Sequence, residues 1–269
     1  MAMTEQARVA AVVPHYGRDT QSNEWLKVCV RSLLEQTTPL DAIVVMDDAS
    51  PCSPETALAP FQEVTLLRSR ENVGPFALVD HCFSRLDMDA ILLSDSDDHS
   101  RPERLERLLA AARRTDAEMI GCLMEIELET PGLSASEPPE RPEFPRDFLL
   151  QMPESHLMTL PSCLIATQLV KRLGGLATGL RFGGDSEFVR RAIIGGEVYN
   201  LQETLYVRRI HPDSLTRNRQ TGFGTEARVK VQQALQARAR SLVRTWCLGE
   251  ATDLSPLTRR EQPLRLKHL

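Results

Sequence analysis

The chain has 269 residues, of which 42% are hydrophobic and 26% are charged, as in ordinary soluble globular proteins. Its 37 acidic side chains outnumber the 32 basic ones, which argues against a nucleic-acid partner. The six cysteines show no Cys-x-x-Cys or Cys/His ligand spacing, and no signal-peptide core or membrane-length apolar run occurs. The sequence therefore predicts a cytoplasmic protein with buried, reduced thiols.

Short apolar runs alternate with amphipathic segments along the first half of the chain. The apolar runs predict buried strands at residues 8–13, 42–46, 64–67 and 90–93. The periodic segments predict helices at 22–37, 54–59, 75–86 and 101–114, the first of them capped by Ser22. This alternation predicts an α/β fold with a doubly wound, mostly parallel sheet.

The second half of the chain is less regular. Residues 129–147 are rich in Pro, Glu and Arg and are interpreted as an exposed excursion, with a lid as an open alternative. The other predicted elements are strands at 118–127, 197–201 and 204–209, a helix capped by Ser162 and ended by Gly174-Gly175, helices at 185–194 and 224–248, and a polar tail over 250–269.

Three carboxylates, Asp95, Asp97 and Asp98, follow the predicted strand at 90–93. Ser100 and Glu103 match a capping box, so the acids are expected in the turn between a strand and a helix. Carboxylates this crowded favour a hard divalent cation. The plain alternative is that they only favour the positive end of a helix dipole.

Polar residues follow two further predicted strands, those that end at Val13 and Met46. Right-handed crossovers bring the carboxyl ends of parallel strands to one edge of the sheet. Ligands of open α/β sheets bind at that edge, so the sequence predicts one binding site there.

Seven short motifs occur in order along residues 8–217. They are Val13-Pro14-x-Tyr16, Gln36-Thr37, Val45-Met46-Asp47-Asp48-Ala49-Ser50, Glu71-Asn72-Val73-Gly74, Asp95-Ser96-Asp97-Asp98, Gly184-Asp185-x-Glu187 and His211-x-x-Ser214-x-Thr216. Together they resemble the motifs of the family 2 glycosyltransferases of GT-A fold. The resemblance implies a Rossmann-like GT-A fold and the inverting transfer of a hexosyl group from a nucleotide-diphosphate sugar, of UDP type, to an acceptor hydroxyl. It also implies a Mn²⁺ or Mg²⁺ cofactor.

The resemblance also implies a division of the chain. A catalytic domain is expected over residues 1–217, with a nucleotide-sugar-binding half at 1–127 and an acceptor half at 128–217. A C-terminal helix and tail, 218–269, would extend the acceptor side.

Individual roles follow from the resemblance as well. Asp97 is implied to bind the cation, Asp95 the cation or the donor ribose, and His211 the cation or the diphosphate. Asp185 is implied to be the catalytic base, with Glu187 as the next candidate. The implied nucleotide-sugar contacts are Pro14, Tyr16, Asp47, Asn72, Gly74 and Asp95. The chain departs from the family pattern at His15, where Thr or Ser is usual, and at Gly184, where an acid is usual.

Plainer interpretations of the same residues stay open. Asp47 and Asn72–Gly74 would serve as turn residues, Asp185 as a helix N-cap and His211 as a loop histidine. A nucleotidyltransferase on a similar sheet would favour a glycine-rich, lysine-containing phosphate loop, which residues 14–18 do not form. A non-catalytic nucleotide-sugar-binding protein is the alternative that is not an enzyme.

The predicted helix at 224–248 is rich in basic residues. A solvated face, a homodimer interface and peripheral contact with the inner face of an anionic membrane are all open for it. The acceptor is equally open among a glycan, a lipid-linked molecule and a small molecule. The basic residues are Arg228, Lys230, Arg238, Arg240 and Arg244.

Overall fold

The computed structural model describes residues 6–129, 141–212, 214, 217, 222 and 224–268. The strands found there are β1 (Val9–His15), β2 (Ala42–Asp47), β3 (Val64–Ser69), β4 (Ala90–Leu93), β5 (His99–Ser100), β6 (Met119–Leu128), β7 (Leu164–Ala166), β8 (Val198–Ile210) and β9 (Leu266–His268). They form one sheet in the order β5-β8-β6-β7-β4-β1-β2-β3-β9. The predicted α/β class with a mostly parallel sheet is confirmed.

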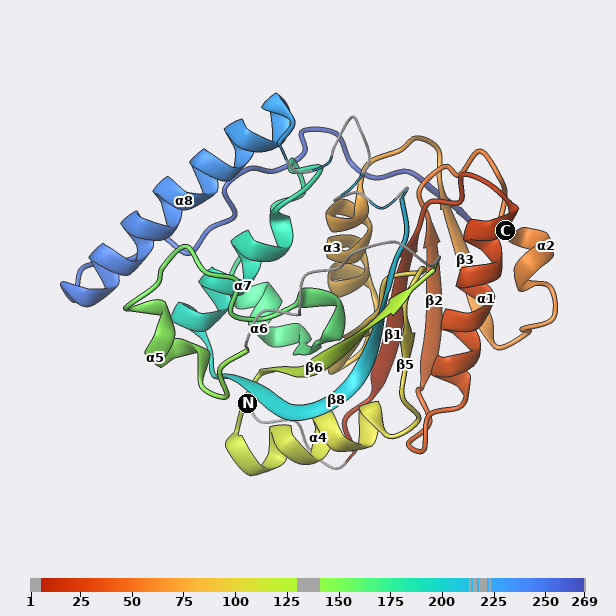
Figure 1. Ribbon diagram of the computed structural model, residues 1–269, viewed down its shortest axis with the longest axis horizontal. Helices are drawn as coiled ribbons and strands as arrows, with labels where there is room; N and C mark the ends of the chain where they lie inside the picture. Colours follow the sequence, from red (N-terminus) through yellow and green to blue (C-terminus); the bar gives the residue numbers. More distant parts are fainter. Residues whose placement is uncertain are drawn as a thin grey trace.

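Helices cover both faces of this sheet (Figure 1). The helices are α1 (Thr20–Leu34), α2 (Glu55–Leu58), α3 (Pro75–Arg85), α4 (Arg104–Thr115), α5 (Pro145–Leu149), η1 (Leu160–Ser162, a 3₁₀ turn), α6 (Thr167–Arg172), α7 (Gly184–Gly195) and α8 (Glu226–Cys247). α1 and α2 lie on one side of the central strands, and α3, which returns from β3 to β4, lies on the other. Right-handed crossovers in opposite directions require this arrangement.

The central strands are built from apolar residues with little or no exposed surface. β1 runs parallel to β2 and β4, and β2 runs parallel to β3, as predicted. β1 nevertheless continues through Pro14, where the sequence predicted its end. Val12 O accepts a hydrogen bond from Ser94 N at the end of β4, so Pro14, two residues on, faces beyond β4. The missing proline N–H therefore breaks no ladder bond.

The far half of the sheet differs from the prediction in two ways. β7 lies antiparallel between β4 and β6, where the sequence predicted only an apolar segment. β8 is one continuous strand, although two strands at 197–201 and 204–209 were expected. Its register against β6 shifts between Cys122 and Met124, opposite the polar pair Gln202-Glu203 that suggested a break.

Two predicted helix starts are wrong. The N-cap of α1 is Asp19, whose Oδ1 accepts a hydrogen bond of 2.8 Å from Ser22 N, so Ser22 is inside the helix. Ser100 belongs to β5, and α4 begins only at Arg104. Ser100 Oγ instead accepts a hydrogen bond of 2.9 Å from the buried Arg104 guanidinium. The acids after β4 are thus followed by a short strand, not by a helix.

Two further expectations concern the middle of the chain. Ser162 lies in η1, and the N-cap of α6 is Ala166, without a side-chain cap bond. The predicted end at Gly174-Gly175 is confirmed, with φ angles of 75° and 89° that favour glycine. Within the predicted excursion, residues 130–140 lie outside the described part of the chain, and α5 begins at Pro145.

The C-terminal segment, which the sequence suggested only as a polar tail, packs against the rest of the fold. β9 pairs antiparallel with β3 and forms one edge of the sheet. Leu254, Leu264 and Leu266 pack against the hydrophobic core. Leucines spaced this irregularly in a polar segment give no periodic signal in the sequence.

All six cysteines are free, as predicted. Cys29, Cys82, Cys122 and Cys163 are buried, whereas Cys247 is exposed. Burial raises the pKa of the Cys29, Cys82 and Cys163 thiols to about 12, which makes them unreactive at neutral pH.

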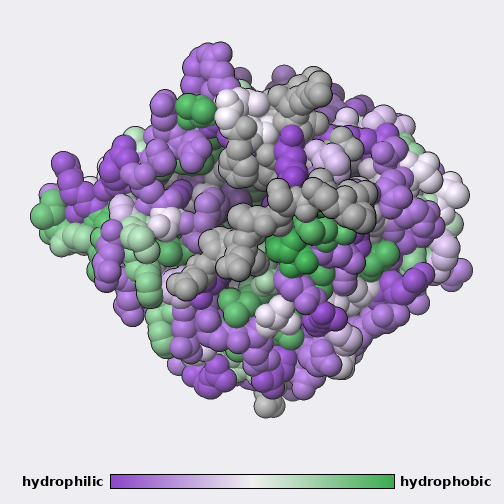
Figure 2. Space-filling view, in the orientation of Figure 1, coloured by the Kyte–Doolittle hydropathy of each residue, from purple (hydrophilic) through white to green (hydrophobic). Residues whose placement is uncertain are grey.

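The surface seen in Figure 2 is mostly hydrophilic, with apolar patches between polar regions. Several large exposed apolar side chains come from α5 and its neighbours, namely Phe144, Phe148, Leu150 and Met152. In the part of the chain that the structure describes, no helix is both long and apolar enough to span a membrane. Peripheral contact or dimerisation through α8 stays a prediction.

Candidate functional site

The turn between β4 and β5 gathers the three acids of the sequence motif. Asp95, Asp97 and Asp98 each offer a carboxylate oxygen, and these oxygens lie within 4.8 Å of one another. The turn places them at the carboxyl ends of β1 and β4, which run parallel. The predicted convergence of acids at this edge is therefore present in the structure.

Burial and mutual repulsion raise the pKa values of two of these acids. Burial and repulsion from Asp97 raise the pKa of the Asp95 carboxyl to about 7. Burial and repulsion from Asp97 and Asp95 raise the pKa of Asp98 well above its usual range, although Oδ1 of Asp98 accepts a hydrogen bond of 2.8 Å from Arg209 N. The Tyr206 hydroxyl accepts a hydrogen bond of 3.0 Å from Asp95 N. A positive charge placed among these oxygens would relieve their repulsion.

His211 is held beside the acids from two sides. Its Nε2 lies 2.8 Å from Oδ2 of Asp97, and its buried Nδ1 has no hydrogen-bond partner in the described part of the chain. The Trp25 ring of α1 lies 4.4 Å from the His211 ring, centroid to centroid. Arg209, whose guanidinium is 5.8 Å from the Trp25 ring, also donates a hydrogen bond to Asp97 O. The sequence suggested Trp25 only as part of the apolar face of α1.

The end of β2 presents Asp47, which is fully buried. Its Oδ1 accepts a hydrogen bond of 3.1 Å from Ser50 N, and its Oδ2 lies 2.9 Å from Arg68 Nη1. The Arg68 contact is not aligned as a hydrogen bond, so Oδ2 keeps an unused acceptor position among the described residues. A buried carboxylate with a spare acceptor is suited to a ligand N–H or O–H.

The motif around Asn72 and Gly74 is brought against Asp48. The two Asp48 oxygens accept hydrogen bonds from Val73 N and Gly74 N, at 2.6 and 2.9 Å. The Asn72 side chain donates a longer hydrogen bond, 3.4 Å, to Asp48 O. Gly74 has a φ of 87°, which a side chain would make costly. This motif therefore ties the loop before α3 to the end of β2.

His15, the departure from the family pattern, is buried at the end of β1. Its Nδ1 lies 3.0 Å from Ser96 Oγ, and its Nε2 lies 3.0 Å from Asn23 Oδ1. Burial lowers the pKa of His15, which favours the neutral ring. His15 thus joins β1, α1 and the acidic turn. Next to it, Pro14 is half-buried and Tyr16 is 41% exposed, so the Tyr16 ring is open to a ligand.

Asp185 lies in the first turn of α7, but it is not the N-cap. The N-cap is Gly183, in the left-handed conformation with φ 81°, and no side chain caps the helix. The negative charge of Asp185 acts on the pKa of Asp95 and of His156, so the three groups lie within electrostatic range of one another. The simple capping interpretation of Asp185 therefore fails.

Glu187, the second candidate for the base, is committed elsewhere. It is buried and forms an ion pair of 2.7 Å with Arg191, which has no exposed surface. Arg191 also donates hydrogen bonds to the backbone of Leu173, Gly175 and Leu254. Glu187 is therefore a structural anion under α7, and its carboxylate does not reach solvent.

Arg208 of β8 is a cation within electrostatic range of Asp95 and His156. It follows Tyr206 by two residues, so both lie on the same side of the strand. Its charge lowers the pKa of Asp95 and of His156. No hydrogen bond or ion pair joins the half-buried guanidinium to any residue that the structure describes. Arg208 is thus available to an anionic ligand.

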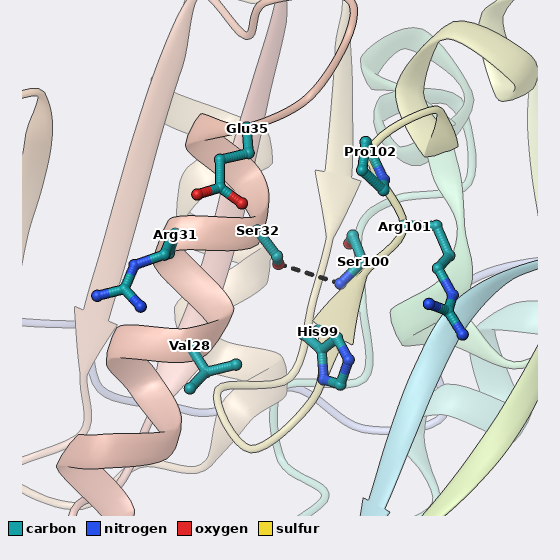
Figure 3. A pocket seen from close by; sticks show the side chains of 8 residues that line it. All are labelled: Val28, Arg31, Ser32, Glu35, His99, Ser100, Arg101 and Pro102. Atoms are coloured by element: carbon teal, nitrogen blue, oxygen red, sulfur yellow. Dashed lines mark hydrogen bonds between the residues drawn. The ribbon is translucent and has the colours of Figure 1, made fainter.

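A separate hollow of about 210 Å³ lies between α1 and β5 (Figure 3). The hydrogen bond drawn there, 3.0 Å long, runs from Ser100 N to Ser32 Oγ and joins the two elements. None of the predicted site residues lines it. The lining residues are Val28, Arg31, Ser32, Glu35, His99, Ser100, Arg101 and Pro102.

The sequence model described as Glycosyl transferase family 2 matches residues 10–173, more than half of the chain. The chain belongs to glycosyl transferase family 2. The match covers the acidic turn and β1 to α6, but it ends before Asp185. The family resemblance read from the motifs is therefore confirmed.

A curated relative and two solved structures illustrate this family membership. Hyaluronan synthase of Streptococcus pyogenes is 35% identical over 113 residues, which are 38% of this chain and 26% of that protein. The chain therefore spans about a quarter of the length of this curated relative. S. aureus TarS 1–349 in complex with UDP-GlcNAc has a TM-score of 0.61 at 17% identity, over 76% of this chain and 59% of that one.

The second solved structure is the mannosyltransferase PcManGT from Pyrobaculum calidifontis in complex with GDP-Man and Mn²⁺. Its TM-score is 0.58 at 17% identity, over 93% of this chain and 67% of that one. At this identity, the likeness establishes the fold. The predicted GT-A architecture is confirmed.

Proposed function

We propose that this family 2 enzyme transfers a sugar from a nucleoside-diphosphate sugar of UDP type to an acceptor hydroxyl, with inversion at the anomeric carbon. The observation that carries the proposal is the acidic cluster, with oxygens of Asp95, Asp97 and Asp98 within 4.8 Å of one another at the carboxyl edge of parallel strands. The fold neighbours support the donor class, since TarS was solved with UDP-GlcNAc and PcManGT with GDP-Man.

The cluster fits a divalent cation, Mn²⁺ or Mg²⁺. Asp97 and Asp95 would hold the ion through oxygen, the ligand atom that both metals prefer. His211 would complete the set, since its ring lies against Asp97 and has a buried nitrogen without a hydrogen-bond partner among the described residues. When bound, such an ion supplies positive charge that stabilises the diphosphate leaving group.

The nucleoside lies, in this proposal, along the ends of β1 and β2. The spare oxygen of Asp47 accepts a hydrogen bond from the base or ribose, and the exposed Tyr16 ring packs against the base beside Pro14. Asn72 and Gly74 act through Asp48, by fixing the loop that borders this side. Arg208 faces the phosphates as a second cation.

Asp185 serves as the base that removes the proton of the acceptor hydroxyl. An alcohol has a pKa far above neutral, so it needs a carboxylate within hydrogen-bond reach as it attacks. Asp185 comes from α7, whereas the acids that face the leaving group follow β4. Attack from one side and departure on the other, in a single displacement, invert the anomeric carbon.

The proposal is tested by incubating the full chain with a panel of UDP- and GDP-sugars, Mn²⁺ and candidate acceptors, and following nucleoside diphosphate release. EDTA or Asp97→Ala should abolish turnover. Asp185→Asn should lower kcat by about 10²–10⁴-fold and leave donor affinity unchanged, because general-base catalysis contributes about that much. NMR of the product should show an inverted anomeric centre.

Three results would contradict parts of this function. Full activity in EDTA would remove the cation from the mechanism. A product with retained anomeric configuration would exclude the single displacement. Tight nucleotide-sugar binding, without hydrolysis or transfer under any of these conditions, would identify a non-catalytic binding protein.

A further inference from the structure

A small hollow lies beside Asp185, between α7 and α8, which pack side by side (Figure 1). Its volume is about 80 Å³, enough for several water molecules or for one edge of a larger ligand. Gly183 and Ser186, which flank Asp185 in sequence, both line it. The other lining residues are Glu154, His156, Phe182, Arg190, Arg228, Val231, Gln232, Leu235 and Gln236.

The floor of this hollow is polar and close to neutral. The Ser186 hydroxyl lies 2.8 Å from Nε2 of His156, and burial lowers the pKa of that ring, which favours its neutral form. The Arg190 guanidinium is occupied by the backbone oxygens of Pro153 and Glu154, at 3.0 and 2.7 Å. The charges nearest the floor are therefore already engaged within the protein.

α8 adds amide groups to the walls of the hollow, and Phe182, just before α7, adds an aromatic ring. Gln232 and Gln236 are four residues apart, so they lie on one face of the helix, and both line the hollow. The Phe182 ring also lines the hollow, with the Arg228 guanidinium 4.7 Å from its centre. Each amide offers both a donor and an acceptor to a ligand, which matches the hydroxyl groups of a sugar.

We propose that this hollow is the acceptor subsite and that it binds a sugar residue of a saccharide acceptor. The inference rests on the proposed function, because it makes Asp185 the base next to the hollow. Gln232 and Gln236 bind hydroxyls of that residue, and Phe182 packs against its carbon-bound hydrogens. The attacking hydroxyl lies toward Asp185.

The chemistry of the walls favours a saccharide over a phosphate-bearing acceptor. The charged groups that line the hollow are engaged within the protein: Glu154 pairs with Arg240, Arg190 donates to backbone oxygens, and Arg228 lies over the Phe182 ring. The two amides and the neutral His156 ring are the uncharged polar groups of the walls, and they suit the hydroxyls of a sugar. α8 also lies beyond residues 10–173, the stretch that the family shares. The lining residues of α8 therefore lie outside the stretch that the family model matches, whereas the acidic turn lies inside it.

The test compares Gln232→Ala and Gln236→Ala with Gln233→Ala, a matched control on the same helix whose side chain is exposed and does not line the hollow. Binding of a panel of methyl glycosides and disaccharides is followed by ligand-observed NMR with UDP and Mn²⁺ present. Each hollow variant should weaken binding of the saccharide that wild type selects by about two- to tenfold, the value of one hydrogen bond. Gln233→Ala should bind like wild type.

Hydrolysis of the nucleotide sugar in water, without any acceptor, separates this inference from the proposed function. The hollow variants should hydrolyse the donor at the wild-type rate, because they do not touch the donor side. If wild type does not hydrolyse the donor at all, the proposed function is refuted instead. The subsite is refuted if all three variants bind the saccharides equally. It is also refuted if inorganic phosphate competes with the saccharide in wild type and not in Gln236→Ala, since the hollow would then bind an anion.

Discussion

Protons and a divalent cation should compete for the acidic turn. Burial and repulsion from Asp97 raise the pKa of Asp95 to about 7 in the metal-free protein, against 3.8 for an ordinary aspartate. Near pH 6 the folded chain therefore holds a proton that a cation must displace. Because the folded-state pKa lies above the unfolded one, the stability that this carboxyl contributes to the metal-free fold should be greatest in acid and should be lost as the pH rises through about 7. Cation affinity should change in the opposite direction.

The size of the effect follows from one competing proton. With a pKa of about 7, the apparent Kd for Mn²⁺ should rise about 25-fold between about pH 7.5 and about pH 5.5, approaching about tenfold per unit in acid. Isothermal titration calorimetry in two buffers of different ionisation enthalpy measures the affinity and counts the protons released. Close to one proton should leave on binding near pH 6, and far fewer near pH 8.

Asp95→Asn supplies the control, since an amide binds no proton in this range. The variant should bind Mn²⁺ more weakly at neutral pH, with a much shallower dependence on pH. An affinity that is equal at the two pH values in wild type, with no proton release, would show that Asp95 does not hold the ion.

Three further outcomes are expected. Asp47→Asn should raise the donor KM and leave kcat nearly unchanged in steady-state kinetics, because it removes a contact made equally in ground and transition states; an unchanged KM would return Asp47 to a structural role. Arg191→Met should lower the free energy of unfolding by about 3–5 kcal/mol in urea titrations, since it leaves the Glu187 carboxylate buried and unpaired, and Glu187→Gln in the same chain should recover part of the loss. Trp25→Leu should weaken Mn²⁺ binding by about tenfold or more in calorimetry, since it removes the ring against His211, while an unchanged affinity would show that the stacking does not position that ligand.

The central fold could be predicted from the sequence because its signals are local. β1, β2 and β4 are uninterrupted apolar runs buried on both faces, and the amphipathic helices between them set the crossovers. β7 and β9 could not be found, because each has three residues and exists only through pairing with a neighbour distant in sequence. The two-strand prediction for β8 failed since a polar pair in one long strand looks like a turn.

In the candidate site too, residues in local motifs could be predicted, whereas contacts between distant parts of the chain could not. Asp47, Asp95, Asp97 and His211 carry recognisable motifs, and the structure gathers the last three at one turn. Trp25 could not be found, because a tryptophan on the apolar face of an amphipathic helix is ordinarily a core residue. Its role depends on the His211 ring, which a strand from the far half of the sheet brings to it.

The two substrates thus depend on different kinds of support. The donor side stands on parallel strand ends inside the stretch that the family shares, so its acids are held by backbone pairing. Asp185 lies in the first turn of α7, and the Arg191–Glu187 ion pair holds this helix in place. The C-terminal segment supports that pair, because Leu254 O accepts a hydrogen bond from Arg191 and Leu257 N donates one to Glu187. A change at Leu254 or Leu257 therefore reaches the acceptor side first. Substitutions at these anchors should alter the rate of transfer to the acceptor before they alter donor binding, because β1, β2 and β4 make no use of them.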